Sequence, residues 1–361
     1  MMAGYDIIDG VGIIPDGITL IERNAFEGRK DLKSVIIPST VTEIGSGAFC
    51  DCTGLKSITI PRSVTKLGIC VFLGCSGLQQ VTLSGSLTDL GPCLTFKDCS
   101  SLASITIPDS VTAIGMSVFE GCTSLEDVVI PGSVKEIDEK AFAGCTALKE
   151  ITIPDSVVKI HRSAFECCTG LTSISIPRSV TRISSGAFFD CSGLTIVNIP
   201  DAVTKIEDYA FYNCTGLKSM TIPETVTAIE ESAFEGCTGL TCINIPHAVK
   251  RIGEGAFKGC ISLEKVVIPD SVRLINSMTF EGCTALADVV IPNSVTMIGE
   301  SAFDGCKSLT RVVIPNSVTE IGNCAFMGCT GLKSITISNT VTRIGDGAFA
   351  GCSNLTSDPT S

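Results

Sequence analysis

The chain has 361 residues, of which 44% are hydrophobic and 5% aromatic, and its 38 acidic and 26 basic residues give a net charge of -12. The basic residues are scattered, which argues against nucleic acid binding, because that depends on clustered Lys and Arg. No apolar run approaches the ~18 residues of a membrane-spanning helix, so no membrane span is predicted. The chain has no Trp and only three Tyr, so we expect no aromatic platform for bases or sugars.

Residues 1–14 precede the regular part of the chain. We expect this segment to form a degenerate N-terminal cap or half-repeat. It lacks a basic start followed by an apolar core of ~7 to 15 residues, so the pattern does not indicate a secretory signal.

A unit marked by proline then recurs along the chain. The markers are evenly spaced, as at Pro131, Pro154 and Pro177, and only the step from Ser84 to Pro108 is longer, by a single residue. Eleven residues after each marker, or twelve in the fourth unit, stands a phenylalanine, so that 15 of the 16 Phe residues form one column, from Phe26 to Phe349. A fixed period of this length predicts a solenoid in which stacked turns share one core. It also predicts that the whole Phe column is buried.

Within one unit, the apolar residues indicate two extended pieces and a tight turn. Residues 171–176 alternate between apolar and polar, which is typical of a strand with one buried face, and Pro177 ends it. Residues 180–183 form a second short extended piece. Residues 187–191 then pack Ala, Phe and Cys inward through a turn that is either extended or helical.

These residues carry a family resemblance. The pattern L-x-x-I-x-I-P-x-S-V-T-x-I-G-x-x-A-F-x-G-C-T resembles the BspA-like class of leucine-rich repeats over essentially the whole chain. The resemblance implies a single leucine-rich-repeat solenoid over residues 1–361, of about 15 turns, in which residues 339–361 are the final half-repeat and tail. It further implies a β-rich fold with one parallel strand per turn on the concave face. Proteins of this class include adhesins and surface antigens, which implies a cell-surface or extracellular location, whereas the missing export signal favours the cytoplasm.

Fourteen of the 20 cysteines occupy one repeat position, shortly after the Phe, from Cys52 to Cys352. One Cys per turn is what a core position produces, because a free Cys behaves as a small buried hydrophobe. We therefore favour a buried column of free thiols over disulfides or metal ligands. Six cysteines lie outside this column, and if a bridge or metal exists it is expected among Cys50, Cys70 and Cys93.

The two histidines, His161 and His247, lie four repeats apart and cannot share a site. Each is expected at the surface. Catalytic arrangements such as Ser/His/Asp or Cys/His need a neighbouring histidine, so we predict no enzyme and no catalytic, cofactor or metal site.

Outward-facing strand positions are the remaining candidates for function, because the inward-facing positions are already used to pack the core. Most carry Ser or Thr. An exception spans three successive units and is predicted to bring together Lys265, Val267, Asp288, Val290, Arg311 and Val313. An apolar strip beside alternating charges favours either simple cross-strand stabilisation or a partner-binding patch.

Three functions therefore remain open. The first is a non-catalytic scaffold for protein–protein interaction or adhesion, with a protein partner bound on the extended β face. The second is a structural subunit or fragment of a larger assembly. The third and most distant is an ice-binding surface formed by the Ser and Thr residues.

Overall fold

The computed structural model describes residues 5–356. The chain divides into two compact units, Met1–Val180 and Thr181–Ser361. Each unit is a parallel β-solenoid built from the repeat, as the sequence predicts. Among the described residues there is no helix, so the helical alternative for the turn around the Phe is wrong. That segment is a run of tight turns.

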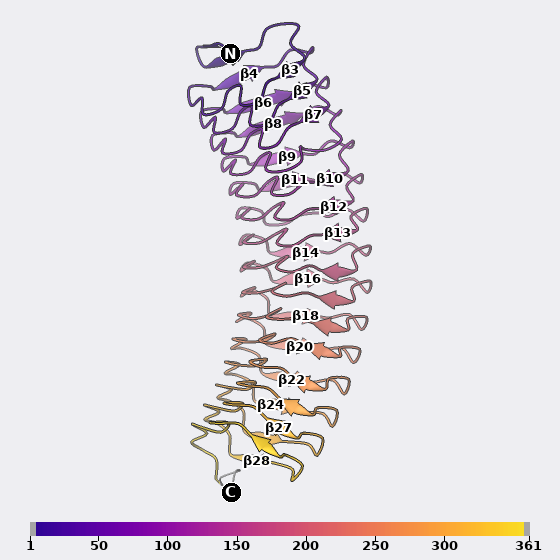
Figure 1. Cartoon of the computed structure of the whole chain (residues 1–361), viewed down its shortest axis with the longest axis vertical. Helices are drawn as coiled ribbons and strands as arrows, with labels where there is room; N and C mark the ends of the chain where they lie inside the picture. Colours follow the sequence, from indigo (N-terminus) through magenta and orange to yellow (C-terminus); the bar gives the residue numbers. More distant parts are fainter. Residues whose placement is uncertain (1–4, 357–361) are drawn as a thin grey trace. The chain divides into compact units, whose positions relative to one another are not determined.

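In the N-terminal unit the turns stack two parallel ladders of strands, seen as two columns of arrows in Figure 1. The first ladder holds strands of three or four residues: β2 (Val11–Ile13), β4 (Ser34–Ile36), β6 (Ser57–Ile60), β8 (Gln80–Leu83), β9 (Ser104–Thr106), β11 (Asp127–Val129) and β14 (Ser173–Ser175). The second holds strands of two residues: β3 (Leu20–Ile21), β5 (Glu43–Ile44), β7 (Lys66–Leu67), β10 (Ala113–Ile114), β12 (Glu136–Ile137) and β13 (Lys159–Ile160). Paired strands are offset by one repeat, so that Ser57 lies opposite Gln80.

The N-terminal unit begins with an antiparallel hairpin. Strand β1 (Ile7–Ile8) pairs antiparallel with β2, which pairs in parallel with β4. Asp9 and Gly10 connect the two strands with φ values of 53° and 84°, which suits the tight turn of a two-residue hairpin. Tyr5 stacks on Phe26 with ring centroids 5.2 Å apart. The Tyr5 ring therefore covers the first Phe of the column.

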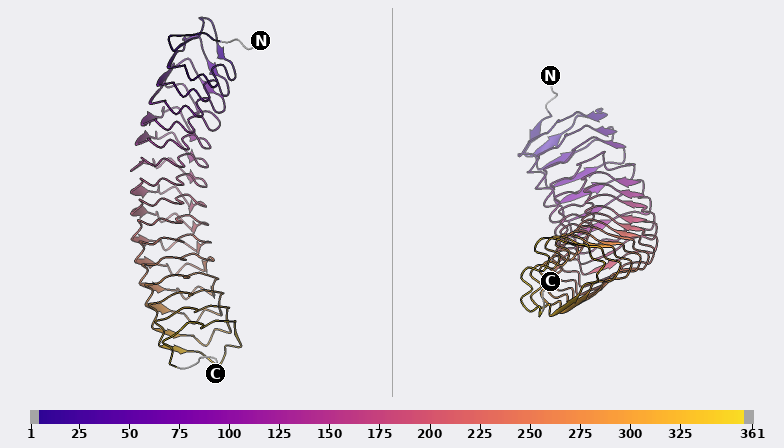
Figure 2. Two further views of the ribbon diagram at one scale, coloured as in Figure 1. Left: turned by 90° about the vertical axis from the view of Figure 1, so that its left-hand side faces the viewer. Right: turned by 60° about the horizontal axis from the view of Figure 1, so that its bottom comes forward.

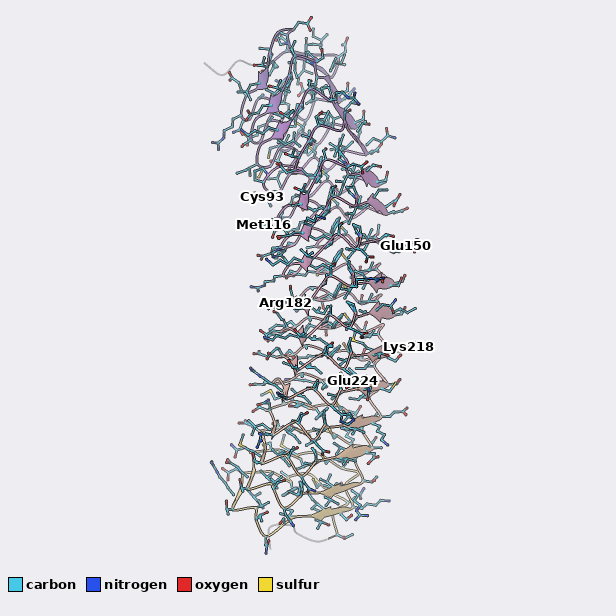
Figure 3. The ribbon with its side chains drawn as sticks, turned by 90° about the vertical axis from the view of Figure 1, so that its right-hand side faces the viewer. Cys93, Met116, Glu150, Arg182, Lys218 and Glu224 are labelled. Carbon is cyan, nitrogen blue, oxygen red and sulfur yellow. The ribbon has the colours of Figure 1, made fainter. Side chains whose placement is uncertain are left out.

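The longer fourth repeat interrupts the second ladder. No strand of this ladder is assigned between β7 and β10. Instead, Cys93 forms an isolated parallel bridge with Met116 of the next turn, and the two are labelled next to each other in Figure 3. Leu94 has a φ of 60°, close to the 58° of Cys70 one turn earlier. The extra residue is thus absorbed before Leu94, and the following turns keep their period.

The C-terminal unit repeats the two-ladder arrangement, with its later turns in orange and yellow in Figure 2. Its first ladder has strands of three residues: β16 (Ile196–Asn198), β18 (Ser219–Thr221), β20 (Cys242–Asn244), β22 (Lys265–Val267), β24 (Asp288–Val290), β26 (Arg311–Val313) and β28 (Ser334–Thr336). Its second ladder has strands of two residues: β15 (Arg182–Ile183), β17 (Lys205–Ile206), β19 (Ala228–Ile229), β21 (Arg251–Ile252), β23 (Leu274–Ile275), β25 (Met297–Ile298), β27 (Glu320–Ile321) and β29 (Arg343–Ile344).

The core of each unit is made of columns of identical side chains. Successive Phe rings stack nearly parallel, with centroids 5.3 Å apart for Phe26 and Phe49 and 5.4 Å apart for Phe211 and Phe234. The column is buried as predicted, with one exception. Phe349 is only half-buried, because among the described residues a Phe ring packs on just one of its sides.

Candidate functional site

The predicted partner-binding residues lie on neighbouring strands of the first ladder in the C-terminal unit. β22 pairs in parallel with β24, so that Lys265 lies opposite Asp288 and Val267 opposite Val290. Val313 lies on β26, in the next turn. Val267, Val290 and Val313 are 50%, 53% and 49% exposed, because alternate residues of a strand face away from the core. We call these three residues the valine strip.

The charges beside the valine strip form only one ion pair. The Lys265 Nζ atom lies 3.6 Å from Asp288 Oδ2, and both side chains are well exposed. Arg311 takes part in no ion pair with a described residue. An exposed pair of this kind contributes about 0 to 1 kcal/mol. The alternating charges expected from the sequence therefore do not form a continuous ion-pair ladder.

An open groove of about 580 Å³ adjoins the valine strip. Val290 and Val313 supply its apolar wall, and Asn293, Asn316 and Ser338 supply polar groups. The sequence analysis did not assign either asparagine to a site. The sequence feature that could have revealed them is their position directly after the marker proline in consecutive units, on the same turns as the strip.

A second open groove, of about 700 Å³, carries a concentration of positive charge in the same unit. It is lined by Lys250, Arg251 and Arg273, together with the half-exposed Leu274. Sequence reasoning missed this cluster because it treated the basic residues as scattered. The sequence feature that could have revealed the cluster is a replacement in the second extended piece of the repeat, whose pattern is V-T-x-I. In two successive turns, Lys250 and Arg273 replace its Thr.

The Cys column lies inside both units, as predicted. Every member from Cys52 to Cys329 is buried, and Cys352 is half-buried. The thiols donate hydrogen bonds to backbone carbonyl oxygens of the Phe column, as from Cys237 Sγ to Phe211 O at 3.1 Å. Burial raises the pKa of the Cys237 thiol to about 12. A buried thiol with a pKa raised in this way is protonated and unreactive at neutral pH.

The cysteines outside the column on the second, third and fourth repeats are also thiols. Cys50, Cys70 and Cys93 are free, the first buried and the other two half-buried. Desolvation by burial is the main cause that raises the pKa of Cys50 to about 11, and the neighbouring Asp51 carboxylate adds to it. Within residues 5–356, no three His, Cys, Asp or Glu side chains converge in a way that could hold a metal ion.

The histidines differ in their surroundings. His161 is half-buried, with its Nε2 atom 3.1 Å from Glu136 Oε2 and its Nδ1 atom 3.9 Å from Asp138 Oδ1. His247 is exposed.

The part of the chain that the structure describes has no helix of the length and apolarity that crossing a bilayer requires.

Comparison with known proteins places the chain in a family. The model of the BspA type leucine rich repeat region matches residues 12–115, 92–218, 204–333 and 275–358. A leucine-rich repeat protein from Bacteroides ovatus is 32% identical, with 96% of this chain and 88% of that one covered and a TM-score of 0.73. A leucine rich cell surface protein from Faecalibacterium prausnitzii is 31% identical, with 96% and 86% covered and a TM-score of 0.50.

A leucine-rich repeat protein from Eubacterium ventriosum, 23% identical over 92% of this chain and 86% of that one with a TM-score of 0.53, shares the fold. No curated protein matches at a significant level. The family model spans nearly the whole chain, and the solved structures repeat its architecture. The chain therefore belongs to the family of BspA-type leucine-rich-repeat proteins.

Proposed function

We propose that this protein is a non-catalytic, protein-binding scaffold, and that the valine strip, with Lys265, Asp288 and Arg311 beside it, is one of its partner-binding surfaces. Leucine-rich-repeat proteins commonly bind proteins, which supports the general role. The cell-surface description of the relative from Faecalibacterium prausnitzii supports a location at the cell surface for it.

The observation that carries the proposal is the alignment of three half-exposed valines beside an open groove. In the first ladder of the N-terminal unit, Val129 stands alone at this position and Ile36 lies opposite a single apolar residue, Ile13. Val267 and Val290 are instead direct neighbours, with Val313 on the following turn. A contiguous apolar surface with a polar rim is the usual composition of a protein interface. The uncompensated charge of Arg311 adds a donor for a partner carboxylate.

The test uses the intact chain to select binding peptides from a random display library, followed by measurement of each Kd by calorimetry. Combined replacement of Val267, Val290 and Val313 by Ser is expected to weaken the selected peptides at least tenfold. The matched control replaces Val129 by Ser, which removes an isolated apolar residue from the same repeat position and should leave the Kd unchanged.

The same variants separate binding from cross-strand stabilisation. If every selected peptide binds the strip variant as well as the parent, the strip is not a binding surface. A loss of unfolding free energy of about 0.2 to 1 kcal/mol per valine pair, without loss of binding, assigns the strip to stabilisation alone.

A further inference from the structure

Three of the four aromatic residues outside the Phe column gather at one place. The chain has 16 Phe and three Tyr, so four aromatic residues lie outside the column, and Tyr5 covers its first ring. The other three are Phe189, Tyr209 and Tyr212, all in the C-terminal unit. Phe189 and Tyr212 stack with centroids 4.6 Å apart, and Tyr209 meets Tyr212 edge-on at 6.0 Å. We call these three rings the aromatic platform.

The aromatic platform occupies positions that the repeat leaves at the surface. Phe189 and Tyr212 each follow a column Phe directly, and the next two turns carry Glu235 and Lys258 at that position. Phe189 and Tyr212 are half-buried against each other, while Tyr209 is 36% exposed. The rings are therefore not part of the core, and core packing does not account for them.

The backbone at Tyr209 is also costly for an aromatic residue. Tyr209 has a φ of 57°, and the equivalent positions in other turns of this unit include Gly186 and Gly255, with φ values of 60° and 59°. A non-glycine residue in this left-handed region loses ~1 to 2 kcal/mol. The Tyr209 hydroxyl donates a hydrogen bond to Glu231 Oε1 at 2.7 Å, which fixes the direction of the ring.

Negative charge surrounds the platform without compensation. The hydrogen bond to Glu231 is the main cause that raises the pKa of Tyr209 to about 12, and the charges of Glu235 and Asp208 add to it. None of these three carboxylates forms an ion pair with any residue in the described part of the chain. The acids next to them in sequence are instead paired, Glu207 with Arg182 at 3.3 Å and Glu230 with both Lys205 and Arg251. The rings are therefore bordered by carboxylates that can form ion pairs with a cationic partner.

We propose that the aromatic platform and its three carboxylates bind a cationic segment of a partner protein, with an Arg or Lys side chain placed over the rings. A cation over an aromatic face is attracted by the ring quadrupole, and a planar guanidinium also stacks on it. The rim of Asp208, Glu231 and Glu235 attracts the same charge and repels phosphate or sulfate groups. This surface uses none of the residues of the valine strip, so the two proposals can be tested independently of each other.

The lack of Trp makes a direct measurement possible. Tyr209 and Tyr212 are two of the three tyrosines, so they dominate the intrinsic fluorescence of the intact chain. Titration with penta-arginine amide, which has no fluorescence of its own, is expected to change the tyrosine emission in a saturable way at low salt. Penta-citrulline, the uncharged counterpart, should cause no change. The absence of a saturable change with penta-arginine would overturn the proposal.

Variants then separate the platform from the overall negative charge of the chain, with anisotropy of a fluorescein-labelled penta-arginine as the measurement. Combined Tyr209→Gly and Tyr212→Leu should weaken binding about tenfold, as expected for the loss of two cation–π contacts. Glycine occupies the equivalent position in some turns of the unit, as Gly186 and Gly255 do, and leucine keeps an apolar contact for Phe189, so this variant should keep its circular dichroism spectrum. Combined Asp208→Asn and Glu231→Gln should weaken binding several-fold.

The matched control is Glu224→Gln with Glu264→Gln, which removes the same charge from exposed positions of the same unit. It should change the affinity less than twofold. Unchanged binding in the tyrosine variant, or an equal loss in the control, would show that the peptide responds only to net charge and would refute the platform as a site.

Discussion

At the scale of the residue, each Phe inside the column is shielded from water by the Phe of the turn before and the turn after. Phe211 has no exposed surface, and its ring lies 5.3 Å from Phe188 and 5.4 Å from Phe234. Such spacing is within the range of favourable ring pairs. Shortening one Phe therefore removes packing contacts from its own turn and from both neighbouring turns.

We expect Phe211→Ala to lower the free energy of unfolding by about 3 to 5 kcal/mol, since it removes buried surface and leaves a cavity. Denaturant unfolding followed by circular dichroism measures this value. Phe349→Ala is the control, because Phe349 is only half-buried and should lose less. A loss below about 1 kcal/mol for Phe211→Ala would mean that the column is not the core.

At the scale of the structural element, the Cys column links successive turns through the backbone. Each thiol of the column whose hydrogen bond is described contacts the carbonyl oxygen of a Phe in the preceding turn, as in Cys145 with Phe119 O at 3.2 Å and Cys283 with Phe257 O at 3.1 Å. The same carbonyl also accepts the backbone N–H of the Cys in its own turn, as Phe119 O does from Cys122 N at 3.1 Å, so the thiol is its second donor. The Cys side chain is thus both a small apolar filler and a donor, which an alanine would not be.

The raised thiol pKa values predict a steep loss of stability at alkaline pH. In Cys122, Cys168, Cys237 and Cys283, burial raises the pKa from 9.0 to about 12. The unfolded chain loses these protons near pH 9 and the folded chain does not. The free energy of unfolding is therefore not reduced by these thiols below pH 9. Between pH 9 and about 12 it falls by ~1.4 kcal/mol per pH unit for each such thiol.

A circular dichroism titration from pH 7 to 12, in the presence of a reductant, measures this unfolding. The exposed Cys242→Ser should leave the midpoint unchanged, since that thiol is not in the column. A protein that stays folded and stable at pH 11 would contradict the buried-thiol column.

At the scale of the whole molecule, the stacking within each unit is local along the chain. In the C-terminal unit a described turn pairs only with the preceding and the following turn, as β17 does with β15 and β19. Stability is then close to a sum of turns and their interfaces. One entire turn can be removed without changing the register of the others.

We expect deletion of residues 247–269, one full repeat, to give a folded protein with a lower unfolding free energy and a smaller denaturant m-value. The join restores the sequence I-N-I-P-D-S-V at Pro246 and Asp270. Deletion of residues 247–258 is the control, because it removes half a turn together with Phe257 and should lower stability far more. Equal effects of the two deletions would contradict the modular stacking.

The sequence alone determined the parts that depend on the period. The alternation at residues 171–176 sets which residues face inward, and the constant repeat length sets which residues become neighbours, so the strands, the Phe column and the Cys column were all predictable. The fourth repeat was identified by its length, and the structure gives the outcome as the isolated bridge from Cys93 to Met116.

Only the tertiary structure decided what happens outside these ladders. The turn beside the Phe could not be assigned from sequence, because residues as different as Gly186, Tyr209 and Met278 share its left-handed conformation, and that conformation excludes a continuing helix. The aromatic platform depends on it too, since the left-handed backbone of Tyr209 and the hydrogen bond to Glu231 set the position of the ring beside Tyr212. Periodicity fixes which residues share a turn or a column, whereas the direction of a surface side chain is set by local backbone torsion and by the partners that it finds in the folded protein.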